Sequence, residues 1–517
     1  MKTIINERMA DRKCRLEARL DKFNFPADLS RPMMRSTNVQ FDLAGRGVGT
    51  AYGGLGLIRQ LVRDLGLAEA IDDRLHLFKV HLPYHESDHV LNLAYNALCD
   101  GRCLEDLELR RQDEAYLNML GAERIPDPTT AGDFCRRFEP CHLQKLHEAY
   151  DATRLKIWSR QSAEFFAQAR IEADGTMVET GAECKHGIAL SYKCIWCYHP
   201  LLLTLANTGE VLRLVNRSGN RPSHEGAPAL FDECIALCRR AGFRSILLRG
   251  DTDFSQTKHL DRWHEQGDVQ FVFGLDVTPG RFMNADDLPR STWKPLKRPP
   301  KYKTSPNPKR RARPARVKQQ IVEARGFKDI RLTGEEVAEM PYRPVACRHT
   351  YRLIILRKNL EVNDPRQGRL FDDDYCYLFY LTNDPNSTPA QIVFSANDRC
   401  QQENVLAQLK AARALHAPVD NLLSNGAYML MTALAWNLKA WLALSLSAEQ
   451  GEKPAEHTAL KYRLLGIEFR TFVNRFVRIP AQVVQTGRRI VVRLLAWNTW
   501  QPVFFRLAAQ FSRPRRC

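Results

Sequence analysis

The sequence lacks the apolar segments that membrane or secreted proteins require. No stretch approaches about 18 uninterrupted apolar residues, and the N-terminal segment MKTIINERMADRKCRLEARL has no apolar region of the kind found in a secretory signal. The most apolar helical stretch, from Gly426 to Leu446, carries Asn437 and Lys439 at its middle, which favours a buried core helix. These absences predict a cytoplasmic protein that does not enter a membrane.

The fourteen cysteines do not form the repeated knuckles typical of structural zinc sites. The best candidates are Cys194 and Cys197 in CIWC, together with Cys234 and Cys238 one helical turn apart. CIWC stands in a strand-like run, and free cysteines commonly pack as small hydrophobic side chains in a reducing cytoplasm. A structural zinc protein therefore remains an alternative that metal analysis would test.

Acidic residues are outnumbered by basic ones, 59 to 76, which gives a formal charge of +17 and favours a polyanionic partner. The imbalance is greatest in residues 294–318, which contain eleven Lys or Arg, six Pro and no Asp or Glu. This segment cannot bury a core, and such dense charge of one sign predicts contact with nucleic acid, although a solvated insertion is the alternative. The residues predicted to contact DNA here are Lys309, Arg310, Arg311 and Arg313.

The periodicity of apolar residues changes along the chain. Residues 52–150 follow a helical period, whereas the region from Phe165 has strand-like runs, including two strands separated by the turn residues Asn207, Thr208 and Gly209. A helix over 227–241, the strand SILLRGD, a helix from about 255 to 266 and the strand VQFVFGLDV then follow. A hairpin followed by a βαβ pattern predicts a mixed sheet with helices packed on it.

Two later runs, YRLIILRK and DDYCYLFYLTN, are also rich in strand-forming residues. They would extend this sheet or form an inserted subdomain. Helical patterns return from about Asp398 to Leu415 and from Gly426 to Leu446, and a basic tail follows.

Three acidic residues stand where a fold can bring them together. Asp174 in IEADGT and Asp251 in LRGDTDF end strand-like runs, while Glu403 lies on a helical pattern. Three converging carboxylates are hard oxygen ligands suited to Mg²⁺, with Mn²⁺ as a substitute, and such ions support in-line phosphoryl transfer. In a basic chain, the phosphates most simply belong to a nucleic acid.

Two cations share the helix face of Glu403. Arg399 lies one turn before it and Lys410 lies two turns after it. This spacing is expected where a phosphate chain crosses a metal-binding helix, but an ordinary salt-bridged surface helix would have it too.

These motifs resemble those of DDE transposases from bacterial insertion sequences, within the insertion sequence 4 group and most like the insertion sequence 1380 family. The resemblance rests on IEADGT followed by Gly181, the hairpin segment YHPLLLTLANTGEVLRLVNRSGN, RGDTDF, and the spacing of Arg399, Glu403 and Lys410. The last spacing is similar to the tyrosine, arginine, glutamate, lysine signature of the group, except that Ala396 occupies the tyrosine position. Asp251 aligns with the first Asp of the family motif, and Asp253 is the reserve candidate.

The resemblance implies an α/β fold with a ribonuclease H-like mixed sheet, a β-rich insertion, and helical N-terminal and C-terminal regions. Asp174, Asp251 and Glu403 would bind the metals, and Arg399 and Lys410 would hold DNA. The expected parts are an N-terminal arm (1–50), a helical DNA-binding domain (51–160), a catalytic domain (161–280 and 385–450), the basic loop and β-rich insertion (281–384), and a basic region for DNA or dimer contacts (451–517).

The implied function is cut-and-paste transposition, in which terminal inverted repeats in double-stranded DNA are bound, cut and transferred to target DNA. A homodimer would pair the two ends, in the bacterial cytoplasm at the nucleoid. The alternative is a catalytically inactive DNA-binding protein derived from a transposase.

Overall fold

The computed structural model describes residues 2–20, 48–79, 83–182, 184–298, 335–359, 375–486 and 489–512. The chain divides into two compact units. Unit 1 consists of Met1–Phe165, Gly175–Arg221 and Asn404–Cys517, and unit 2 consists of Phe166–Asp174 and Pro222–Glu403. Within the described ranges, no helix has the length and apolar character needed to span a membrane.

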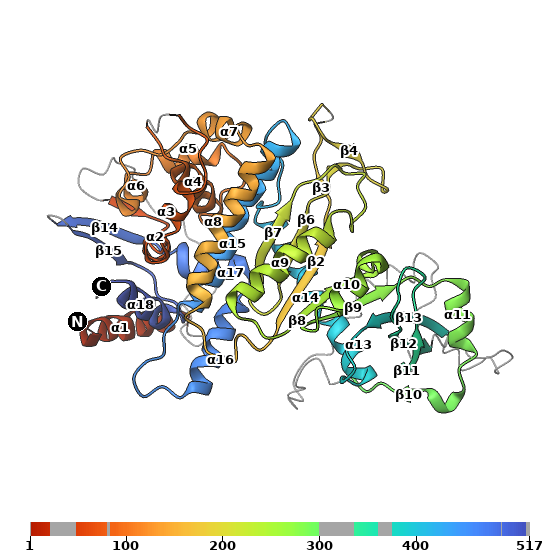
Figure 1. Cartoon of the computed structure of the whole chain (residues 1–517). Helices are drawn as coiled ribbons and strands as arrows, with labels where there is room; N and C mark the ends of the chain where they lie inside the picture. The colour runs from red at the N-terminus through yellow and green to blue at the C-terminus, as the bar shows by residue number, and fades with distance from the viewer. Residues whose placement is uncertain are drawn as a thin grey trace, which may run out of the picture. The chain divides into compact units, whose positions relative to one another are not determined.

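Unit 1 is built mainly from helices (Figure 1). Its helices are α1 (Lys2–Leu20), α2 (Leu55–Leu65), α3 (Leu67–Asp72), α4 (Glu86–Leu98), α5 (Asp106–Arg111), α6 (Glu114–Leu120), α7 (Pro128–Arg136), α8 (Pro140–Trp158), α15 (Leu422–Leu444), α16 (Pro454–Leu465), α17 (Phe469–Phe472), the π turn η4 (Val473–Val477) and α18 (Gln501–Phe511). Its strands are β1 (Val48–Thr50), β3 (Val178–Glu179), β4 (Ala189–Leu190), β5 (Trp196–Tyr198), β6 (Leu201–Leu205), β7 (Glu210–Val215), β14 (Ala481–Thr486) and β15 (Arg489–Leu494).

The core of unit 1 forms around α15, which is buried from Ser424 to Leu444 and packs against α4, α7, α8 and β7 (Figure 1). Its polar residues have partners inside the core. Asn437 accepts a hydrogen bond from the Val211 amide at 2.8 Å and donates to its carbonyl at 3.0 Å, while Lys439 Nζ donates to the Leu465 carbonyl at 3.0 Å. The prediction of a buried core helix is therefore confirmed.

A buried ion network ties α8 to β7 in unit 1. Arg154, which has no exposed side-chain surface, contacts Asp151 and donates to Glu210 Oε1 at 3.0 Å. Glu210 also accepts hydrogen bonds from the indole N–H groups of Trp158 at 2.9 Å and Trp441 at 2.8 Å. Every charge in this network faces an opposite charge or a donor, as buried charges require.

Unit 2 contains a mixed sheet. Its strands are β2 (Ala169–Gly175), β8 (Ile246–Gly250), β9 (Val269–Leu275), β10 (Lys294–Pro295), β11 (Glu335–Tyr342), β12 (Tyr351–Asn359) and β13 (Tyr375–Thr382). Its helices are α9 (Ala227–Ala241), η1 (Thr252–Phe254), η2 (Thr257–His259), α10 (Leu260–His264), α11 (Pro279–Asp286), η3 (Arg290–Thr292), α13 (Pro389–Asn397) and the start of α14 (Cys400–Ala411).

The strand order within unit 2 is β10-β11-β12-β13-β9-β8-β2, in which β2, β8 and β9 are parallel and the remaining pairs are antiparallel. The predicted later strands thus extend the sheet through the β13–β9 pair. Phe273 of β9 meets Phe231 of α9 and Trp263 of α10 on one face. Because side chains alternate along a strand, Val272 faces the opposite side, where α13 packs.

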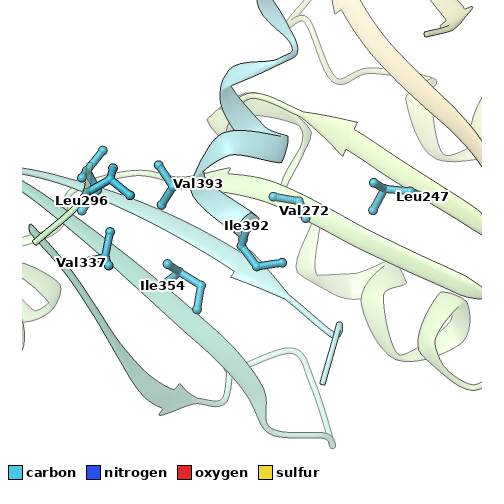
Figure 2. Close-up of a cluster of buried hydrophobic side chains, with 8 residues drawn as sticks. Leu247, Val272, Leu296, Val337, Ile354, Ile392 and Val393 are labelled. Atoms are coloured by element: carbon cyan, nitrogen blue, oxygen red, sulfur yellow. The ribbon is translucent and has the colours of Figure 1, made fainter. Parts of the chain in front are cut away.

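The packing of α13 is apolar (Figure 2). Ile392 and Val393 lie in a buried cluster with Leu247, Val272 and Ile354 from the sheet. Thr388 caps the helix, because its hydroxyl accepts a hydrogen bond from the Gln391 backbone amide and the Gln391 side-chain oxygen accepts one from the Thr388 backbone amide. This cluster fixes α13 on the sheet face that carries the residues described below.

Two sequence predictions need correction. Residues 255–266 form short turns and the five-residue helix α10 rather than one long helix. The C-terminal region is not wholly helical, because β14 and β15 form a hairpin that pairs with β1.

Candidate active site

Two neighbouring parallel strands bring Asp174 and Asp251 to one edge of the unit 2 sheet. In the register of β2 and β8, Glu172 pairs with Arg249, so the two aspartates follow at matching positions two residues later. Asp174 lies in β2, and Asp251 comes directly after the last residue of β8. The carboxyl ends of parallel strands are where α/β sheets bind ligands.

The chain turns sharply at Asp251. Its Oδ1 accepts the Asp253 amide at 3.1 Å and thereby caps the turn η1. Gly250 makes room for this turn, because a Cβ there would lie 2.6 Å from the Phe254 Cβ. The strand therefore does not continue to Asp253, whose side chain is exposed on the turn.

A single guanidinium group faces all three predicted carboxylates. Arg399 Nη1 lies 3.7 Å from Asp174 Oδ2 and 3.9 Å from Asp251 Oδ2, and its Nη2 lies 4.0 Å from Glu403 Oε1. Arg399 is 17% exposed and Glu403 is 64% exposed, so the guanidinium is largely buried and Glu403 lies on the solvent side of the cluster. The structure thus gathers these carboxylates, from distant parts of the sequence, around one positive charge.

A break between α13 and α14 creates this arrangement. The sequence predicted a helix from about Asp398 to Leu415, and α14 (Cys400–Ala411) lies within that range, whereas α13, which ends at Asn397, was not predicted. Arg399 stands at the junction, and its amide donates to the Ala396 carbonyl at 3.4 Å.

Burial shapes the electrostatics of the cluster. Desolvation raises the pKa of Asp251, while the nearby charge of Arg399 acts to lower it. Asp253 and Asp276 add negative charge and also raise this pKa. The carboxylates therefore repel one another, and the nearby charge of Arg399 favours their ionised form.

The carboxylates fit a divalent metal by donor chemistry, since Asp and Glu oxygens are the ligands that Mg²⁺ and Mn²⁺ prefer. Arg399 Nη1 is buried and has no hydrogen-bond partner among the described residues, and its distances to the carboxylates exceed those of a charge-assisted hydrogen bond. Arg399 supplies the positive charge in this arrangement. Binding of a metal by all three carboxylates would require them to approach one another.

Among the described residues, one group of three ligand atoms lies within 4.8 Å of one another, and it consists of Glu139, Cys141 and His142. These side chains are exposed or half-exposed at the start of α8, where the Glu139 amide donates to His142 Nδ1 at 3.1 Å as part of a helix cap. In the residues that the structure describes, neither the predicted cysteine pairs nor Asp174, Asp251 and Glu403 belong to such a group.

The remaining predicted DNA contacts have different outcomes. Lys410 is exposed near the end of α14, in the same helix as Glu403. Lys309, Arg310, Arg311 and Arg313 lie outside the described residues.

Two buried residues that lie next to the carboxylate cluster, Glu172 and Arg249, were not predicted from the sequence. Glu172 is 1% exposed and Arg249 is 2% exposed, and they form an ion pair across β2 and β8. Burial raises the pKa of Glu172, although the charge of Arg249 opposes this effect. The available signal was the spacing, because each residue stands two positions before a candidate aspartate and therefore on the same strand face.

Comparisons with known proteins identify the type of domain. The family model "Transposase DDE domain group 1" matches residues 31–516. A search of curated proteins finds no match. Among solved structures, the chain is similar to piggyBac transposase in a synaptic complex with hairpin DNA, with 9% identity, a TM-score of 0.33, and coverage of 83% of this chain and 84% of the other. A TM-score this low establishes no shared fold.

Proposed function

Because the chain belongs to the family of transposase DDE domain group 1, we propose that it is a metal-dependent DNA transposase whose catalytic carboxylates are Asp174, Asp251 and Glu403. The observation that carries this proposal is the approach of one carboxylate oxygen from each residue to within 4.0 Å of the Arg399 guanidinium. The substrate is double-stranded DNA carrying the terminal inverted repeats of the element that encodes the chain.

Each residue has a defined role in this proposal. Asp174 and Asp251 would hold the metal from the sheet edge, and Glu403 of α14 would complete the ligand set. A bound divalent metal, Mg²⁺ or Mn²⁺, polarises a phosphate oxygen and lowers the pKa of the attacking water. Arg399 and Lys410 contact DNA phosphates near the cleaved end, because cations on the helix of a metal ligand hold a phosphate chain beside the metal.

The reaction proceeds by two phosphoryl transfers. Water first attacks the phosphodiester at each element end, the P–O bond to the 3′ oxygen breaks, and a 3′-hydroxyl is released. That hydroxyl then attacks a phosphodiester of target DNA, forming a new P–O bond and expelling the target's own 3′ oxygen. Neither step needs a covalent enzyme intermediate or a redox partner.

The finer assignment follows the sequence motifs. IEADGT, RGDTDF and the Arg399, Glu403, Lys410 spacing support membership of the insertion sequence 4 group, most like the insertion sequence 1380 family. The parallel β2, β8 and β9 strands with α9 between two of them support a ribonuclease H-like catalytic fold. We propose that a homodimer pairs the two ends in the bacterial cytoplasm at the nucleoid.

A cleavage assay on a labelled duplex that carries the terminal repeat tests the proposal, with Mg²⁺ or Mn²⁺ present. Asp174→Asn, Asp251→Asn and Glu403→Gln keep the side-chain shape and remove a metal ligand, so each should reduce cleavage by about 1,000-fold or more while DNA binding persists. Asp253→Asn is the matched control, because it removes a nearby charge on the exposed turn, and it should retain cleavage.

Two results would overturn parts of the proposal. Full activity in Asp251→Asn with loss in Asp253→Asn would transfer the second carboxylate to Asp253. A wild-type protein that binds the repeat and never cuts it with either metal would be an inactive DNA-binding derivative.

A further inference from the structure

Arg249 joins β2 and β8, which lead to the two proposed catalytic aspartates, to α13, the helix that directly precedes the one carrying Glu403. The residue lies in β8, two positions before Asp251. One amino group of its guanidinium contacts Glu172 of β2, and the other, Nη1, donates to the Ser395 carbonyl of α13 at 2.6 Å. Asp174 lies two residues after Glu172, and the chain runs directly from α13 to Glu403.

The β2 contact sets the relative position of the two aspartates. Glu172 and Arg249 are direct neighbours in the parallel register. Since residues two apart point to the same face of a strand, this ion pair lies on the face that also presents Asp174 and Asp251. Any slip between the two strands would break the pair and separate the aspartates.

The α13 contact fixes the end of the helix. The Arg399 amide donates to the Ala396 carbonyl at 3.4 Å, so the Ser395 carbonyl is available to Arg249. Carbonyl groups in the last turn of a helix carry partial negative charge and accept bonds from cations. The apolar cluster that includes Ile392 and Val393 holds the body of α13 on the sheet (Figure 2), whereas Arg249 holds the end from which Arg399 and Glu403 continue.

We propose that Arg249 is a positioning residue that sets the separation of Asp174, Asp251 and Glu403 through its paired contacts with Glu172 and Ser395. This inference rests on the proposed function. An arginine is required because its planar fork donates in two directions at once, whereas a lysine in its place presents a single point charge. A buried ion pair adds little net stability compared with well-packed apolar residues, so its value here lies in geometry.

Two variants separate positioning from folding. Arg249→Lys keeps the charge and removes the fork, and the double variant Glu172→Met with Arg249→Met replaces the pair by apolar side chains of similar length. The matched control is Glu336→Met with Arg357→Met, which removes another cross-strand ion pair at register neighbours of β11 and β12 in the same sheet.

The first readout is Mn²⁺ affinity measured without DNA, by the EPR signal of free Mn²⁺. Both Arg249 variants should keep a cooperative unfolding transition and bind Mn²⁺ about 10- to 100-fold more weakly, and the control should bind as wild type does. In the cleavage assay, kcat should fall by a similar factor while KM for the repeat changes by less than about threefold, because DNA contacts are retained.

Wild-type Mn²⁺ affinity and kcat in a folded Arg249 double variant would overturn the inference. If the double variant does not fold, the Mn²⁺ affinity of Arg249→Lys tests the inference instead. An affinity equal to that of wild type would then overturn the inference. Failure of the proposed function looks different, since wild-type protein and Asp251→Asn would then show the same Mn²⁺ affinity. The two hypotheses therefore fail by separate measurements.

Discussion

Removal of the Arg399 charge should strengthen metal binding while it weakens catalysis. In the structure this guanidinium lies 3.7 to 4.0 Å from one oxygen of each of Asp174, Asp251 and Glu403. A divalent metal must displace these contacts or bind beside a repelling positive charge. Arg399→Ala removes both obstacles, so the metal should bind more tightly in the absence of DNA.

The magnitude follows from the distances. A pair of unit charges about 4 Å apart interacts by roughly 1 kcal/mol in water and by roughly 4 kcal/mol at the dielectric of a protein surface. Glu403 is 64% exposed and Asp251 is 36% exposed, which favours the lower value for their contacts, and Arg399 itself loses solvation in the cluster. A net gain of about 1 to 3 kcal/mol is expected, which corresponds to roughly 5- to 150-fold in Mn²⁺ affinity.

Mn²⁺ titration of DNA-free protein at pH 7.5 measures this effect, with Asp251→Asn defining the binding that does not involve the site. Arg348→Ala is the matched control, because it removes an equal charge from unit 2 at a residue that pairs with Glu265 instead. Cleavage by Arg399→Ala should fall, since the proposed phosphate contact is lost. Unchanged or weaker Mn²⁺ binding in Arg399→Ala would refute the idea that Arg399 competes with the metal.

Three further predictions concern the supporting structure. Burial lowers the pKa of Lys439 to about 8, so between pH 8 and about 10.5 the unfolded chain holds a proton that the folded one lacks. Wild type should therefore gain on the order of 3 kcal/mol over this range relative to Lys439→Met, and urea unfolding at several pH values measures it. Arg154→Leu removes the cation paired with the buried Glu210 and should cost about 3 to 5 kcal/mol in the same assay, whereas Arg160→Ala, at an exposed pair, should cost less than about 1 kcal/mol. Gly250→Ala should push the turn that carries Asp251 away from Phe254 and reduce kcat by about 100-fold, with normal repeat binding in a gel-shift assay; unchanged kcat would show that the turn absorbs the added methyl group.

The strongly periodic parts of the fold were predictable from the sequence. The helix over 227–241 and the hairpin around Gly209 occur where expected, because amphipathic period and a glycine at positive φ are local signals. Helix α13 was not predicted, whereas α14 lies within the helical pattern expected over 398–415. Local helix propensity also cannot show that the Ser395 carbonyl accepts a hydrogen bond from Arg249, which is far away in the sequence.

The residues of the candidate site could be proposed from the sequence, whereas their geometry could not. Asp174, Asp251 and Glu403 could be chosen from the ends of strand-like runs and from a family motif, and the structure brings all three to Arg399. The choice between Asp251 and Asp253 depended on where β8 ends, and the turn after Gly250 now favours Asp251. The proposed positioning role of Arg249 could not be predicted, because it depends on the register between strands that are far apart in the sequence.

The extension of the sheet beyond β9 has a consequence for how unit 2 is made. Strand β9 pairs on one side with β8 and on the other with β13, whose residue Phe379 lies opposite Leu275 and is synthesised about a hundred residues later. During translation, the parallel strands β2, β8 and β9 therefore exist for some time with one edge of β9 unpaired. Such an edge can recruit strands from other chains. We expect slow translation or truncation before β13 to produce aggregates. Pairing of β13 with β9 should prevent this aggregation, because it covers the exposed edge of β9.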